Sequence, residues 1–330
     1  MLARIAHGLF WLGRDLARAD HTARLLDGVF HADLQGQPDD PAGVTLSWDS
    51  LLAIMSADLP DGEDEPDAPR GPAARDDVLR LLTLDRRQPA SVVACVERAR
   101  EGARTLRDVI STEMWEAVNG FALELQGRDL TAGLRAGPWS TYQLIKQRCA
   151  LVWGLADRTM LRDEAHAFLC AGGQAESADM VLRILRVALP PGEAEDDGER
   201  APLRDGQALA LLHAVGGFQA FRRGVAGPAD AVPVARFLLF DREYPNSVAA
   251  NVEALHGSLA AADISPRSSP PVLRLARLTA DLEFRARAHG GGRGLARTFG
   301  FVQHELALVD RDVADRYFAG AAAPERLVVA

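Results

Sequence analysis

Residues 1–30 read MLARIAHGLFWLGRDLARADHTARLLDGVF and give the clearest helical pattern of the chain. At about 100° per residue, apolar side chains recur along one stripe roughly 100° wide, which is typical of an amphipathic helix packed on a core. The stripe consists of Ile5, Leu9, Leu12, Leu16, Ala19, Ala23 and Leu26. Arg14, Arg18 and His21 point the opposite way, and Asp20 lies four residues before Arg24, where an acid and a base can pair along a helix. We therefore expect a long helix with one apolar and one charged face.

The opening pattern returns in weaker form halfway along the chain. Residues 160–169 read MLRDEAHAFL and residues 172–183 read GGQAESADMVLR, so that Asp179 and Arg183 repeat Asp20 and Arg24 at a distance of 159 residues. A second echo joins DRRQPASVVACVE at 85–97 to DREYPNSVAANVE at 241–253, at a distance of 156 residues. Two echoes in the same order predict an internal duplication into two similar helical-bundle lobes, residues 1–158 and 159–318, followed by a frayed tail at 319–330.

Composition favours an all-α fold. The chain of 330 residues is 48% hydrophobic and only 6% aromatic, and it lacks runs of alternating Val and Ile, so helices are favoured over sheets. Polar stretches with Gly or Pro predict loops at 33–43, 58–71, 127–138 and 189–206.

Charge and cysteine content limit the classes of function. A net charge of −9 argues against nonspecific binding of nucleic acid. The three cysteines lie far apart without a CxxC pair, so we expect no zinc site and no disulfide framework. No Rossmann fingerprint or phosphate-binding GKS or GKT motif is found, and we expect no cofactor. The sequence shows neither an export signal nor an apolar run long enough for a membrane span, which predicts a cytoplasmic location without membrane binding.

Several phrases together resemble the bacterial alpha-E family, a helical domain of uncharacterised function. The family phrase LYWLGRYLERAENTARLLD is similar to residues 9–27, FLLFDRxxPxSV to residues 237–248, and SxEMWExLN to residues 111–119, where Glu113 and Trp115 match. The resemblance covers residues 1 to about 318 and implies a helical protein encoded beside, or fused to, ATP-grasp-type amide ligases and transglutaminase-like proteins. It also implies a system that makes or trims small peptides, and so a possible peptide ligand.

Each copy of the opening phrase has lost part of the family pattern. The Glu of LER is Ala17 in the first copy, which keeps Arg18, and the Asn is His21. The second copy keeps Glu176 and Asp179, but Ser177 replaces the Arg that follows the Glu. Because the losses are complementary, we predict that the two copies lie near each other and line one charged cleft between the lobes.

The candidate binding residues of this cleft leave structural interpretations open. Acids and arginines at helical spacing also form ordinary ion pairs on a solvated face, and the Asp-Arg pairs before Pro89 and Pro245 can simply hold a turn. His166 lies beside two acids but lacks an HExxH pattern, so a metal site is not indicated. The candidates for the cleft are Arg14, Arg18, Asp20, His21, Arg24, Asp163, Glu164, Glu176, Asp179 and Arg183, and those for structural motifs are Asp85, Arg86, Asp241, Arg242, Glu113 and Trp115.

Three hypotheses about function follow. The chain is a non-catalytic accessory protein that binds an amide ligase or its peptide, an enzyme acting on a peptide or amino acid between the lobes, or a helical protein that only assembles with itself. We favour the first, because both copies are incomplete whereas a catalytic site tolerates little loss of geometry.

Overall fold

The computed structural model describes residues 1–34, 46–59, 73–188, 201–288 and 292–319, and within these ranges every regular element is a helix. The all-α prediction is confirmed. None of the helices in these ranges carries a stretch that is long and apolar enough to cross a membrane. The helices up to residue 159 are α1 (Ala3–Leu34), α2 (Trp48–Met55), α3 (Arg75–Leu84), α4 (Val92–Thr105), α5 (Thr112–Gly127), α6 (Leu130–Ala136) and α7 (Trp139–Thr159). Those that follow are α8 (Glu164–Ala188), α9 (Ala201–Ala214), α10 (Phe218–Gly224), α11 (Ala231–Phe240), α12 (Val248–Ala262), a 3₁₀ turn (Pro266–Ser268), α13 (Pro270–Arg287) and α14 (Gly292–Tyr317).

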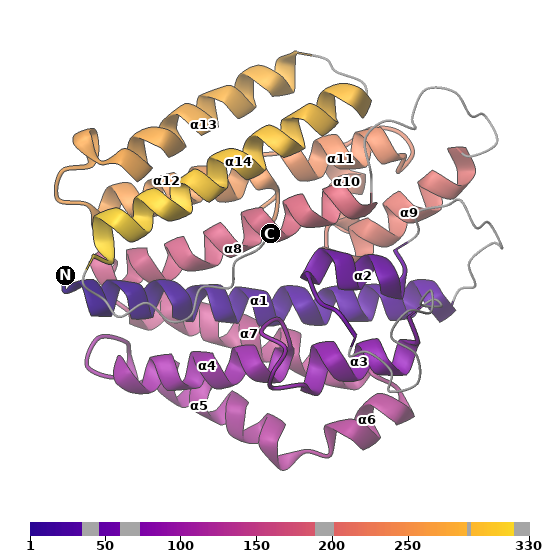
Figure 1. The fold of residues 1–330 in the computed structure, drawn as a ribbon, viewed down its shortest axis with the longest axis horizontal. Helices are drawn as coiled ribbons and strands as arrows, with labels where there is room; N and C mark the ends of the chain where they lie inside the picture. Colours follow the sequence, from indigo (N-terminus) through magenta and orange to yellow (C-terminus); the bar gives the residue numbers. More distant parts are fainter. Residues whose placement is uncertain (35–45, 60–72, 189–200, 289–291, 320–330) are drawn as a thin grey trace, which may run out of the picture.

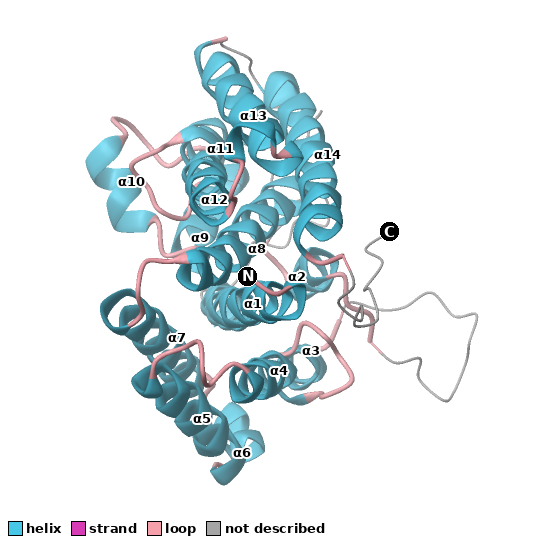
Figure 2. Cartoon of the chain, turned by 90° about the vertical axis from the view of Figure 1, so that its left-hand side faces the viewer, coloured by secondary structure: helices cyan, strands magenta, loops and turns pink. Residues whose placement is uncertain are grey.

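The helices form two groups on either side of a central pair, α1 and α8 (Figures 1 and 2). On one side α1 packs on α4, α4 on α5, α5 on α7, and α7 back on α1. On the other side α8 packs on α12, α12 on α13, α13 on α14, and α14 back on α8. Each group is thus a closed ring of four helices, and the two rings meet where α1 lies against α8.

The two groups also exchange short helices. The short helix α2 follows α1 in the chain and packs on α8 as well as on α1, and α9 follows α8 and packs on α1 as well as on α8. The exchange is close, because a Cβ added to Gly28 of α1 would lie 2.6 Å from the Cβ of Ala214 in α9. Neither group therefore completes its core from its own residues alone.

Glycines allow α1 and α8 to cross at backbone contact. A Cβ on Gly13 would lie 2.1 Å from the carbonyl oxygen of Leu169, and a Cβ on Gly172 would lie 1.8 Å from the carbonyl oxygen of Phe10. Gly13 and Gly172 are 159 residues apart, as are Phe10 and Leu169, so the two contacts are reciprocal. Any larger residue at either glycine would push the helices apart.

Serine caps set where several helices begin. Ser91 and Ser247 accept the backbone N–H of Ala94 and Ala250, as expected for N-caps of α4 and α12. Helix α2 begins with a capping box: the Ser47 hydroxyl accepts the backbone N–H of Ser50, and the backbone N–H of Ser47 donates to the Ser50 hydroxyl.

Two loop predictions need correction. The loop predicted at 127–138 contains α6, which Asp129 caps and which buries Leu130 and Leu134, four residues apart. A helix of about two turns is thus stable in its packed context. In the loop predicted at 189–206, helix α9 begins at Ala201. Residues 189–200, most of the loops predicted at 33–43 and 58–71, and the tail from 320 lie outside the described residues.

Candidate functional site

The charged candidates of the two sequence copies meet at Glu176. Its Oε1 accepts the Nε of Arg18 at 2.6 Å, and its Oε2 accepts the Nη2 of Arg18 at 2.8 Å and the Nε of Arg14 at 3.0 Å. Glu176 comes from α8, both arginines come from α1, and the Glu176 residue is only 1% exposed. One carboxylate thus binds two guanidinium groups in the interior, an arrangement that we call the Glu176 clamp.

Further ion pairs tie the clamp to the surrounding helices. Arg14 also donates through Nη1 to Asp310 of α14, at 3.1 Å from Oδ2. Its neighbour Asp15 accepts the Nη2 and Nε of Arg98 in α4 at 2.6 and 3.0 Å. Because Asp15 and Arg14 point to different helices, α1 is bound by charge on both sides.

The clamp keeps its charges. Burial by itself raises the pKa of Glu176, but the attraction and hydrogen bonds of Arg18 and Arg14 outweigh it and hold that pKa well below its ordinary value. For Arg18 burial lowers the pKa, yet Glu176 outweighs burial and the pKa is raised. A carboxylate held ionised in this way is a poor general acid or base near neutral pH.

One contact in the cluster has the form of a nucleophile and its base. His21 Nε2 lies 3.0 Å from the Oγ of Ser177. Burial lowers the pKa of His21, so the imidazole is neutral, but the residue is only 5% exposed and a substrate would have to displace α1 or α8 to reach it. Burial also raises the pKa of Cys95, whose Sγ accepts from Arg98, to about 12, which keeps that side chain a thiol.

We predicted that these charged side chains line a cleft between the lobes, but Arg14, His21 and Glu176 are buried. Arg14 is 8% exposed and His21 and Glu176 still less, so these side chains fill the contact between α1 and α8 instead of lining a cleft. The helical wheel placed them correctly, opposite the apolar stripe. What it could not show is that α1 is central and is covered on this face as well, by α8.

The other candidates in the opening phrase and its copy form local ion pairs. Arg24 donates to Asp20 within α1 and Arg183 to Asp179 within α8, each at 2.7 Å and each four residues apart. These pairs repeat one another at matching positions and bind no group on the opposite helix. Their role is the structural one that the sequence left open.

Asp163 and Glu164 lie apart from the clamp. Asp163 caps α8 by accepting the backbone N–H of Ala165 at 2.9 Å, and Glu164 binds the amino group of Met1 at 2.9 Å. Twelve residues of helix, about 18 Å, separate Glu164 from Glu176. The structure does not bring these two candidates into the cluster.

The paired Asp-Arg motifs hold turns. Asp85 Oδ1 accepts the N–H of Arg87 at 2.7 Å, and Asp241 Oδ1 accepts the N–H of Glu243 at 2.9 Å. The arginine that follows each aspartate binds a glutamate one helix further on, Arg86 to Glu97 and Arg242 to Glu253.

The motif at the start of α5 lies apart from the clamp. Glu113 is exposed in the first turn of α5. The ring centroid of Trp115 lies 3.9 Å from the guanidinium of Arg107.

Three residues of the cluster were not singled out from the sequence, namely Asp15, Arg98 and Asp310. Asp15 stands inside the opening phrase, so its place beside Arg14 was a usable signal. Arg98 and Asp310 reach the cluster from α4 and α14 through tertiary packing, and no spacing in the sequence marks them. In the part of the chain that the structure describes, no group of three or more His, Cys, Asp or Glu is placed to hold a metal ion.

Comparisons with known proteins identify a helical family that covers almost the whole chain. A family model described as "Alpha-E: A predicted alpha-helical domain with a conserved ER motif" matches residues 1–318. An uncharacterised protein of Mycobacterium bovis and one of Mycobacterium tuberculosis are each 25% identical over 279 residues, which is 81% of this chain but 31% of each relative. The chain thus spans about a third of the length of the curated relatives it matches, and no solved structure matches it.

Proposed function

The chain belongs to the Alpha-E family, and we propose that it is a non-catalytic accessory protein of a system that joins amino acids or peptides by an ATP-grasp-type amide ligase. Its partner would be that ligase, a transglutaminase-like protein, or both. The observation that carries the proposal is the buried Glu176 clamp. The residues that could have formed a catalytic centre are used to join α1 to α8, with Glu176 only 1% exposed.

The span of the relatives supports a role beside other domains. In the mycobacterial relatives the matched region is 31% of the length, so roughly two thirds of each relative lies beyond it. A helical domain that forms part of so long a protein can act together with the other parts of that protein. An ATP-dependent ligase works where ATP is supplied, and we therefore propose a cytoplasmic location.

We also propose that the chain is an internal duplication in which the two copies share one Glu-Arg pair. The reciprocal glycine contacts, the repeated Asp-Arg pairs and the matching turns at Asp85 and Asp241 support this. The first copy keeps Arg18 and the second keeps Glu176, and these two bind each other across the central contact. Each copy could then lose one member of its own pair without losing the contact.

The test is reconstitution with the ATP-grasp-type ligase encoded in the same genome. We expect the purified chain alone to form or cleave no amide bond, to bind the ligase in sedimentation velocity, and to raise the ligase's rate of ADP release until binding saturates. An Alpha-E chain that shows no association with the ligase, or one that turns over peptides without it, would refute the proposal.

A further inference from the structure

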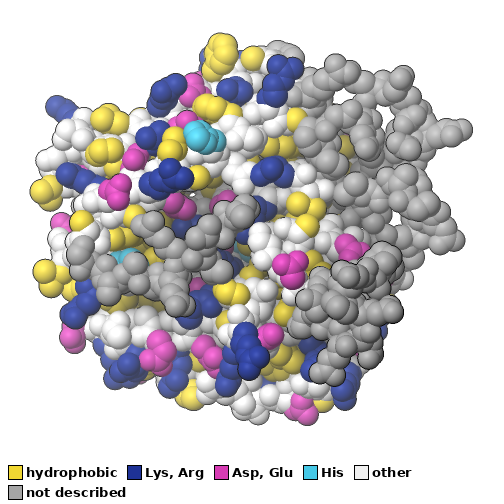
Figure 3. Space-filling model, in the orientation of Figure 1, with side chains coloured by type: hydrophobic (Ala, Val, Ile, Leu, Met, Phe, Trp, Pro, Cys, Tyr) yellow, Lys and Arg dark blue, Asp and Glu magenta, His cyan; other side chains and the backbone are white. Residues whose placement is uncertain are grey.

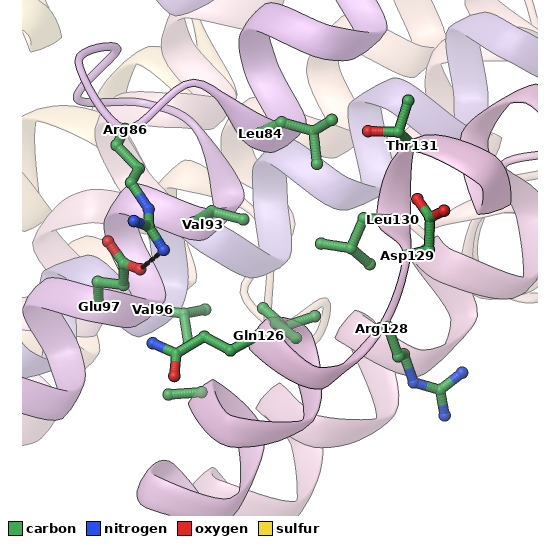
Figure 4. A pocket seen from close by; sticks show the side chains of 12 residues that line it. Leu84, Arg86, Val93, Val96, Glu97, Gln126, Arg128, Asp129, Leu130 and Thr131 are labelled. Atoms are coloured by element: carbon green, nitrogen blue, oxygen red, sulfur yellow. Dashed lines mark ion pairs between the residues drawn. The ribbon is translucent and has the colours of Figure 1, made fainter.

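A cavity opens in the group formed by α1, α4, α5 and α7, which we call the first group, away from the Glu176 clamp. It has a volume of about 290 Å³ and lies where the end of α3, the face of α4, the end of α5 and the start of α6 meet (Figure 4). Aliphatic side chains form its floor, among them Leu84, Val96 and Leu130. None of its lining residues belongs to the clamp, so the two features are independent.

At the corresponding position of the second group, which is formed by α8, α12, α13 and α14, a larger side chain packs against the core. Phe240 stands 156 residues after Leu84, and the Arg236 guanidinium lies 5.5 Å from its ring centroid. Arg236 also donates to the carbonyl oxygen of Ala286, and α11 packs directly on α13. In the first group α3 packs on α6 instead. The cavity is thus lined by the start of α6 and by Leu84, a side chain smaller than Phe240.

Each side of the floor carries one basic and one acidic side chain, Arg86 with Glu97 and Arg128 with Asp129 (Figure 4). On one side Arg86 binds Glu97 through Nη2 at 2.7 Å, and its guanidinium, with five N–H donors, keeps others for a ligand. On the other side Asp129 uses Oδ1 to cap α6, and no cation within the described ranges pairs with its carboxylate. Arg128, the remaining cation of the rim, points away from the cavity and binds Glu124.

We infer that this cavity binds a short zwitterionic peptide with an aliphatic side chain, no larger than a dipeptide. The side chain lies on the apolar floor, the carboxylate binds Arg86 and the ammonium group binds Asp129, because Glu97 is paired with Arg86 and Arg128 with Glu124. The volume is at the lower end of small-molecule sites, roughly 300–1,000 Å³, which sets the upper limit on size. The inference rests on the proposed function and names the class of peptide that the accessory protein would hold.

Calorimetric titration of the full chain with the dipeptide Leu-Leu tests this directly. We expect saturable binding, and at least a tenfold loss of affinity for the same dipeptide with an acetylated amino end and an amidated carboxyl end, since a charge-assisted hydrogen bond contributes about that factor. No heat of binding up to about 10 mM dipeptide, or equal binding of the blocked dipeptide, would overturn the inference.

Three variants locate the site. Leu84→Phe introduces the larger side chain found at the corresponding position of the second group and should abolish binding. Asp129→Asn should weaken it at least tenfold while keeping the cap, because Asn caps helices as well as Asp. Arg135→Ala removes an exposed charge from the last turn of α6, outside the cavity lining, and should bind as the unaltered chain does. Circular dichroism checks folding. If Leu84→Phe fails to fold, Asp129→Asn still decides, and unaltered binding by Asp129→Asn refutes the site.

The two proposals fail separately. Dipeptide binding is measured on the chain alone, whereas association is measured with the ligase. A chain that binds Leu-Leu but not the ligase would refute only the accessory role.

Discussion

The substitution Glu176→Gln removes one negative charge from the clamp and almost no volume. Arg14 and Arg18 then remain in the interior without their shared carboxylate, and the amide offers one acceptor oxygen where the carboxylate used two. Arg14 keeps its contact with Asp310, which is exposed and therefore screened. Arg18 forms its direct ion pair with Glu176, and the substitution removes this pair entirely.

The magnitude follows from burial. Removing one partner of a buried ion pair costs about 3–5 kcal/mol, because the remaining charge is left desolvated. With an unfolding entropy of about 2.1 cal/mol/K per residue, this corresponds to a fall in Tm of roughly 4–7 °C for a chain of this length. The matched control is Glu253→Gln, which removes the same charge from the exposed pair with Arg242 and should destabilise the chain far less.

Urea unfolding followed by far-UV circular dichroism gives both free energies of unfolding. The effect should also depend on pH in a defined direction. Because Arg18 and Arg14 lower the pKa of Glu176 in the folded chain, its contribution is complete above the ordinary value of 4.5 and is lost as the pH falls below it. The difference between the unaltered chain and Glu176→Gln should therefore narrow in acid. If Glu176→Gln is no more destabilising than Glu253→Gln at pH 7, the clamp does not stabilise the fold and the reasoning is refuted.

Three further predictions test neighbouring parts of the account. Burial lowers the pKa of His21, so the unfolded chain takes up its proton first. Stability should therefore fall more steeply below about pH 6.5 in the unaltered chain than in His21→Gln, which keeps the lowered pKa of His7, as measured by urea unfolding at pH 7 and pH 5. Gly172→Ala should destabilise the chain by at least about 3 kcal/mol, since its Cβ would lie 1.8 Å from a backbone oxygen, whereas Gly257→Ala, with open space around it, should stabilise by about 0.5–1 kcal/mol; equal effects in thermal melts would contradict this. Residues 1–158 and 159–318, expressed separately, should each lack a cooperative thermal transition because α2 and α9 pack on the other half, and a sharp transition in either fragment would count against the exchange.

The helical fold class and the contact between Arg18 and Glu176 could be predicted from the sequence for identifiable reasons. The apolar stripe of residues 5–26 reports a helix directly, and the complementary loss at Ala17 and Ser177 indicated that Arg18 and Glu176 act together. Both signals are local, since they depend on spacing within one helix or on comparison of two copies.

What could not be predicted depends on packing between distant helices. Arg98 and Asp310 enter the cluster from α4 and α14 at positions that no repeat marks. The burial of the charged face of α1 follows from its central place, which a helical wheel does not contain. Helix α6 was missed because only seven residues form it, and its Leu130 and Leu134 are too few to show a period.

The central claim is that Arg18 of α1 and Glu176 of α8 form one buried contact that joins the two helix groups. A double-mutant cycle with Arg18→Met, Glu176→Gln and the double variant measures that contact as a coupling free energy. We predict a coupling of at least about 2 kcal/mol at pH 7, because the pair is buried and doubly hydrogen-bonded. A coupling below about 0.5 kcal/mol, the size found for exposed pairs, would contradict the claim.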